Sequence, residues 1–114
     1  MLPGALTPTE VMAAWQAGAD FVKVFPCSQL GGASYIKALK APFPQVPLVA
    51  AGGVNQQTAA DFIGAGAVAI GVGAELIPRR ALERREPTWI LELSHRFLGI
   101  VKEARGLTRL PHER

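Results

Sequence analysis

The sequence predicts an α/β fold in which short parallel strands alternate with helices along the chain. Three apolar segments, at residues 21–25, 46–51 and 68–72, have the composition of strands, and a proline or glycine follows each. Segments with helical spacing of apolar residues lie between them. Repeated alternation of helix and strand indicates a parallel sheet with right-handed crossovers, and ligands of such folds bind beyond the carboxyl ends of the strands.

Residues 2–4 resemble the end of a strand, and a helix with a strong start signal is expected after them. Thr7 can cap that helix, Pro8 suits its first position, and Glu10 stands where a capping box requires it. Gly18 is expected to end the helix before the next strand begins.

The strand at residues 21–25 carries the main catalytic candidate of the chain, Lys23. Alternation places Phe21, Lys23 and Phe25 on one face and two valines on the other, so the strand is predicted to be buried on both faces. Desolvation between two phenylalanines favours a neutral, nucleophilic amine, which a Schiff-base lysine requires. The alternative is a solvent-exposed lysine that protects an edge strand from aggregation.

The remaining elements continue the alternation. A helix is expected at residues 33–40, and another from Asn55 to about residue 65. After the last strand, a short helix is predicted at 79–85 and a longer one at 89–105, which Gly106 ends. The inner stripe of the longer helix consists of apolar residues at helical spacing: Ile90, Leu93, Phe97, Ile100 and Ala104.

Turns with small residues follow the second and third strands. Gly52 and Gly53 form one turn, Gly73 and Ala74 form the other, and both lie at the rim where Lys23 is expected. Glycine leaves backbone N–H groups accessible, and a helix N-terminus adds a favourable dipole for an anion. The two turns therefore predict a phosphate clamp. The alternative is a pair of βα turns that need small residues for steric reasons alone.

Composition and charge exclude several classes of protein. With 114 residues, 49% of them hydrophobic and 18% charged, the chain suits one globular domain. A net charge of +3 without a basic, aromatic-rich block argues against nucleic acid and is compatible with an anionic small molecule. Neither a membrane nor a metal is expected, because no apolar run is long enough and no histidine has companion ligands. The single Cys27 suits a reducing cytoplasm and is interpreted as a small packing thiol.

A resemblance to a known enzyme family rests on five segments in this order: LPGALTPTE, AGADFVKVFP, the Gly31-Gly32 pair, APFPQVPLVAAGGV and AIGVGAELIP. From about residue 2 to about residue 105, the chain resembles the C-terminal half of the 2-dehydro-3-deoxy-phosphogluconate (KDPG) and 4-hydroxy-2-oxoglutarate aldolases. The resemblance implies a (β/α)₈ fold of the TIM-barrel type, of which this chain is the C-terminal half-barrel. A partial barrel domain is then expected at residues 1–106 and a polar tail at 107–114.

The resemblance also implies an activity. The family consists of class I aldolases of Entner–Doudoroff carbohydrate metabolism, which work through a Schiff base without a cofactor. They cleave a 2-keto-3-deoxy (phospho)sugar acid, or 4-hydroxy-2-oxoglutarate, to pyruvate and an aldehyde. Lys23 matches the Schiff-base lysine, and Phe25 and Pro26 match the residues that follow it. The phosphate binders of the family match Gly52, Gly53, Gly73 and Ala74.

Two positions depart from the family pattern. Ala51 stands where the family often has threonine, and Ala74 stands where it often has serine, so two hydroxyl groups are absent. By the same resemblance, the proton-shuttling glutamate and the arginine that holds the pyruvate carboxylate belong to the other half of the barrel. Neither Glu10 nor Glu75 is expected to replace that glutamate.

The expected partners are a small keto acid, phosphorylated or not, and a second protein chain. That chain is another copy, within a homo-oligomer that is a trimer for intact enzymes, or a companion half-barrel. Two other functions stay open: an inactive or trans-complementing half-barrel fragment, and another phosphate-binding barrel such as an epimerase or a phosphate synthase.

Overall fold

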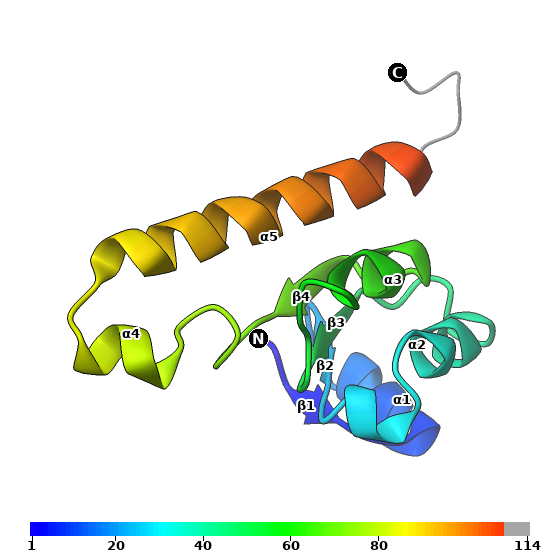
Figure 1. Ribbon diagram of the computed structural model, residues 1–114. Helices are drawn as coiled ribbons and strands as arrows, with labels where there is room; N and C mark the ends of the chain where they lie inside the picture. Colours follow the sequence, from blue (N-terminus) through cyan, green and yellow to red (C-terminus); the bar gives the residue numbers. More distant parts are fainter. Residues whose placement is uncertain (109–114) are drawn as a thin grey trace.

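The computed structural model describes residues 1–108 and contains four strands, five α-helices and one short 3-10 helix (Figure 1). In chain order these are β1 (Gly4–Ala5), α1 (Pro8–Gln16), β2 (Val22–Val24), η1 (Ser28–Leu30), α2 (Ala33–Lys40), β3 (Leu48–Ala51), α3 (Ala59–Gly64), β4 (Ala69–Gly71), α4 (Arg79–Glu83) and α5 (Pro87–Thr108). Most of the predicted polar tail, residues 109–114, lies outside the described residues.

The four strands form one parallel sheet in the order β1-β2-β3-β4. Lys23 is aligned with Gly4 on one side and with Val49 on the other, and Val49 is aligned with Ala69. Strands β2, β3 and β4 each lie inside a segment predicted from the sequence, which confirms the parallel α/β class. Because all strands run in the same direction, their carboxyl ends meet at one rim of the sheet.

Helix α1 begins with the expected capping box. The Thr7 hydroxyl accepts a hydrogen bond from the Glu10 amide at 3.3 Å, and the Glu10 carboxylate accepts one from the Thr7 amide at 3.0 Å. These two bonds satisfy backbone donors that the first helical turn leaves free, so they fix the reversal of the chain after β1.

The hydrophobic core lies on one face of the sheet. Val22 and Val24 of β2 are fully buried there, and helices α1, α2, α3 and α5 contribute apolar side chains to the same cluster. The opposite face of β2 is open, because Phe21 is 45% exposed and Phe25 is 53% exposed. The prediction that this strand is buried on both faces is therefore wrong for the described chain, because both phenylalanines of the second face are largely exposed.

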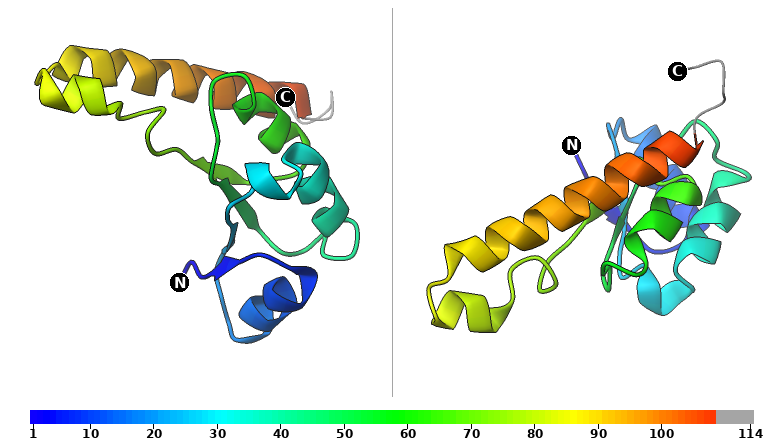
Figure 2. Two further views of the ribbon diagram at one scale, coloured as in Figure 1. Left: turned by 60° about the horizontal axis from the view of Figure 1, so that its bottom comes forward. Right: turned by 45° about the horizontal axis from the view of Figure 1, so that its top comes forward.

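The bounds of α3 and α5 differ from those predicted. Asn55 does not start a helix; its side-chain oxygen accepts hydrogen bonds from the amides of Gln57 and Thr58, and α3 begins only at Ala59. Helix α5 continues to Thr108, past the glycine that was expected to end it. Its predicted inner stripe is confirmed, since Leu93, Phe97 and Ala104 are buried. The helix runs along α3, as the two views of Figure 2 show.

Candidate functional site

A hollow of about 560 Å³ lies at the carboxyl ends of β2, β3 and β4. It is lined by residues from these three strands and the turns after them: Lys23, Phe25, Ala51, Gly52, Gly53, Val54, Gly71, Val72, Gly73, Ala74 and Glu75. Every residue assigned to the site from the sequence is in this set except Pro26. The structure thus brings together a strand lysine and two small-residue turns that are up to about fifty positions apart in the chain.

Lys23 occupies the middle of β2 and is half-buried. Its ammonium nitrogen lies 5.5 Å from the centroid of the Phe25 ring, within the range of a cation–π contact. Lys23 also borders a second hollow of about 360 Å³ on the β1 side, which Glu10 and Pro26 help to line. The lysine therefore lies between two adjoining spaces, on the open face of the sheet.

The Gly52-Gly53 turn needs glycine for a steric reason. Both residues have positive φ angles, +93° and +73°. A Cβ atom on Gly52 would come within 2.8 Å of the Pro26 Cα, and one on Gly53 within 2.7 Å of the Ser28 side-chain oxygen. The chain after β2 is held against this turn, because the Cys27 amide donates to the Ala51 carbonyl at 2.8 Å and the Ser28 amide to the Gly52 carbonyl at 3.2 Å. Close packing of this turn therefore requires glycine at both positions, whether or not their amides bind an anion. This was the alternative to a phosphate clamp in the sequence analysis.

The second turn has the geometry of a helix start. The Gly73 carbonyl accepts hydrogen bonds from the amides of Leu76 at 2.9 Å and Ile77 at 3.0 Å, which form a single helical turn. The first amides of such a turn have no acceptor within it. Among residues 1–108, no hydrogen bond is made by the amides of Gly53, Gly73 or Ala74. Donors from both turns are therefore available to an anion in the hollow.

Two groups near the site, Glu10 and Cys27, have pKa values shifted from their ordinary values. Burial raises the pKa of the Cys27 thiol to about 11, and its sulfur lies 3.9 Å from the Gly32 carbonyl oxygen, which fits the predicted packing role. The pKa of Glu10 is held below its usual value by the hydrogen bonds from the side chain and backbone of Thr7. Glu10 is thus engaged by the capping box at the start of α1.

Ser28 is among the residues beside the site that sequence reasoning missed. Its hydroxyl oxygen is buried without a hydrogen-bond partner among the described residues and lies against Gly53. A serine two positions after a proline matches no motif, and only the spatial approach of the two turns identifies it. Glu75, which was not assigned to the site, also lines the hollow.

The described residues contain no cluster of three or more potential metal ligands. Within residues 1–108, no helix has both the length and the apolarity to cross a membrane.

A model of the KDPG and KHG aldolase family matches residues 1–93 of the chain. The 2-dehydro-3-deoxy-6-phosphogalactonate aldolase of Escherichia coli strain K12 is 44% identical over 75 residues, which make up 65% of this chain and 36% of that protein. The 2-dehydro-3-deoxy-phosphogluconate aldolase of Pseudomonas aeruginosa is 30% identical over 105 residues, or 92% of this chain and 48% of that protein.

Comparison of the fold with solved structures agrees with these sequence similarities. A solved structure described as native KDPGal aligns with a TM-score of 0.75 at 34% identity, over 92% of this chain and 49% of that one. This likeness and the four parallel strands confirm a fold of the TIM-barrel type that is present in part. The chain spans between about a third and a half of the length of these curated relatives.

Proposed function

The chain belongs to the KDPG and KHG aldolase family, and from this premise we propose that it carries the Schiff-base part of a class I aldolase site. The substrate is a 2-keto-3-deoxy (phospho)sugar acid such as KDPG, or 4-hydroxy-2-oxoglutarate, and the products are pyruvate and an aldehyde. One observation carries this proposal: Lys23 and the two small-residue turns line one hollow at the carboxyl ends of the strands.

Lys23 is the proposed nucleophile. Once deprotonated, its amine attacks the C2 ketone of the keto acid, and loss of water gives an iminium ion. The iminium accepts the electron pair of the C3–C4 bond, so that bond breaks while a general base removes the proton of the C4 hydroxyl and the aldehyde departs. The remaining enamine is protonated at C3, and hydrolysis releases pyruvate and restores the lysine. By family resemblance, the general base and the arginine for the pyruvate carboxylate come from outside this chain.

The two turns are the proposed site for the distal phosphate. Amides of Gly52, Gly53, Gly73 and Ala74 would hold it and set the distance between the C2 ketone and Lys23. Ala51 and Ala74 lack the hydroxyl groups that relatives often have there, and a lost neutral hydrogen bond costs about 0.5–1.5 kcal/mol. We therefore expect weaker phosphate binding than in relatives with both hydroxyls, while Schiff-base formation is unaffected.

Trapping with borohydride tests the nucleophile. The 114-residue chain is incubated with pyruvate and borohydride, and the adduct is located by peptide mass. We expect reduction of the iminium to leave an adduct on Lys23 that Lys23→Ala abolishes. The matched variant Lys37→Ala, which removes an exposed lysine of α2, should leave trapping unchanged. Absence of an adduct, or labelling spread equally over Lys37, Lys40 and Lys102, would show that this chain does not build the reactive site.

A second candidate is favoured by the open face of β2. Phe21 and Phe25 are exposed, and among residues 1–108 the outer edges of β1 and β4 have no strand partner. These features suit a half-barrel that has no activity by itself and acts only with a companion. In that case turnover appears only when a companion is added, and Lys23→Ala abolishes it.

A cytoplasmic location forms part of the proposal. The buried Cys27, which forms no disulfide, agrees with a reducing compartment.

A further inference from the structure

Leu6 follows directly after β1, so it lies at the carboxyl end of that strand, next to the strand that carries Lys23. Side chains bind both polar groups of its backbone. The Leu6 amide donates to the Glu10 Oε1 atom at 3.2 Å, and the Leu6 carbonyl accepts a hydrogen bond from the Tyr35 hydroxyl at 2.6 Å. Glu10 belongs to α1 and Tyr35 to α2, so two helices fix the position of this one residue.

We infer that Tyr35 is a positioning residue of the proposed aldolase site. Its hydroxyl holds the Leu6 carbonyl and thereby fixes the wall of the second hollow, the space of about 360 Å³ that Lys23 borders on the β1 side. A keto acid then meets Lys23 in a space whose shape is set before binding. The inference rests on the proposed function, because that proposal makes Lys23 the group that bonds to the keto acid.

The second hollow is the space that Leu6 and Lys23 share. Leu6 and Glu10 line it from the turn between β1 and α1, and Lys23 lines it from β2. The remaining lining residues are Gly4, Ala5, Phe25 and Pro26. Because Leu6 and Lys23 border one space, a displacement of Leu6 changes the room available to a molecule bound to Lys23. Tyr35 does not line this hollow, so it acts on the site through Leu6.

Tyr35 can hold the turn because its own position is fixed. It lies in the first turn of α2, is half-buried and packs against the hydrophobic core. The same helix is anchored by Ile36, which is fully buried, and by Leu39, which is 2% exposed. A tyrosine has only two side-chain torsions, so holding its hydroxyl in place costs little conformational entropy. The bond to Leu6 therefore ties the turn to a rigid part of the fold.

The capping box does not replace the bond from Tyr35. Glu10 Oε1 also accepts hydrogen bonds from the Thr7 amide and the Thr7 hydroxyl, both at 3.0 Å, so the box fixes the turn relative to its own helix, α1. The bond from Tyr35 to Leu6 joins residues 29 positions apart and fixes the turn relative to α2, the helix that follows the strand of Lys23. Of these side-chain hydrogen bonds, only the one from Tyr35 ties the turn to the part of the chain after Lys23.

Borohydride trapping on the full 114-residue chain, over a series of pyruvate concentrations, tests the inference. Tyr35→Phe removes the hydroxyl and keeps the ring that packs on the core. We expect the pyruvate concentration for half-maximal labelling of Lys23 to rise about two- to tenfold, the range that one neutral hydrogen bond supports. Labelling at saturating pyruvate should stay unchanged, because Lys23 itself is intact. The Leu6 amide should exchange faster with solvent, since the turn has lost one of its two anchors.

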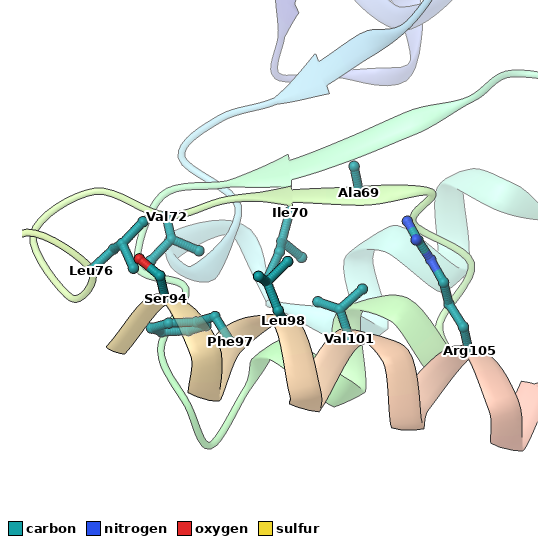
Figure 3. A pocket seen from close by; sticks show the side chains of 9 residues that line it. All are labelled: Ala69, Ile70, Val72, Leu76, Ser94, Phe97, Leu98, Val101 and Arg105. Atoms are coloured by element: carbon teal, nitrogen blue, oxygen red, sulfur yellow. The ribbon is translucent and has the colours of Figure 1, made fainter. Parts of the chain in front are cut away.

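Two serines provide matched controls, because each donates its hydroxyl to a backbone carbonyl away from the turn between β1 and α1. Ser34 precedes Tyr35 in α2 and binds the Gly31 carbonyl at 2.8 Å. Ser94 of α5 binds the Ile90 carbonyl at 2.9 Å and lies among the side chains between β4 and α5 that Figure 3 shows. Ser34→Ala and Ser94→Ala each remove a hydrogen bond of the same type, and both should leave the pyruvate dependence of labelling unchanged.

Several results would overturn the inference. Equal half-saturating pyruvate concentrations for Tyr35→Phe and the native chain would do so, and so would an equal rise in the two serine variants. A rise without faster exchange of the Leu6 amide would mean that Tyr35 does not act through the turn. Failure of Tyr35→Phe to fold without denaturant would assign the hydrogen bond to the fold alone. A native chain that is not labelled on Lys23 would overturn the proposed function together with the inference, whereas the other results leave that function standing.

Discussion

Gly53 lies directly against Ser28, so closely that a Cβ atom on the glycine would be 2.7 Å from the serine Oγ. This contact joins the turn after β3 to the chain after β2, and it holds the edge of the proposed phosphate site. It also means that the turn has a structural requirement separate from any role in binding.

Substitution of Gly53 should therefore destabilise the fold. Gly53→Ala places a side chain at a φ of +73° and against Ser28, and such strain costs roughly 1–3 kcal/mol. Gly99→Ala is the matched control, because nothing lies within 4 Å of a Cβ at this position inside α5, and it should raise stability by about 0.5–1 kcal/mol. Urea unfolding measures both changes. Equal unfolding midpoints for Gly53→Ala and the native chain would contradict the steric account.

The capping box of α1 makes stability depend on acidic pH. The pKa of Glu10 is lowered in the folded chain by its hydrogen bonds with Thr7, so its contribution is fully present above the unfolded value of 4.5 and is lost as pH falls through the lower folded value. We expect the urea midpoint of the native chain to decrease below about pH 4.5 more steeply than that of Glu10→Gln. Asp20, whose pKa is also lowered, is present in both proteins, so the difference isolates Glu10. Parallel pH profiles would show that the box contributes nothing.

Local sequence signals predicted most of the fold because each acts over a few residues. The capping box needs only Thr7 and Glu10, and the placement of Val22 and Val24 on one face of β2 needs only alternation, so both could be predicted directly.

The role of Asn55 was predicted wrongly because asparagine caps a turn as well as a helix. Its side-chain oxygen accepts hydrogen bonds from two amides of the turn, those of Gln57 and Thr58. Gly106 did not end α5, since a glycine inside a helix costs only about 1 kcal/mol.

The residues of the site could be predicted from the sequence, but their solvent exposure and their contacts could not. The parallel order of the strands dictates that Lys23, Gly52 and Gly73 share one rim, and the hollow contains all three. Exposure of the Lys23 face depends on whether another segment covers it, and no pattern within β2 contains that information. Ser28 likewise depends on the approach of two turns that are distant in sequence.

Cys27 should be unreactive in the folded chain. With a pKa of about 11, only about one thiol in a thousand is ionised at pH 8, and the side chain is fully buried. Labelling by a chromogenic disulfide reagent at pH 8 should therefore proceed only as fast as the chain unfolds, and urea should accelerate it to the rate of a free thiol. Immediate stoichiometric labelling without urea would show that the segment after β2 is not packed as described.

Restoring one missing hydroxyl tests the proposed phosphate site. Ala74 is exposed at the rim of the hollow, so Ala74→Ser can be accommodated without repacking and adds a donor beside the amides of the second turn. A neutral hydrogen bond of about 0.5–1.5 kcal/mol corresponds to about two- to tenfold tighter binding. Calorimetric titration with inorganic phosphate should show this decrease in Kd, and Ala60→Ser, at an exposed position of α3 away from the hollow, should show none. If both serine variants bind phosphate equally, the second turn does not hold the phosphate, and the glycines after β3 and β4 serve the fold alone.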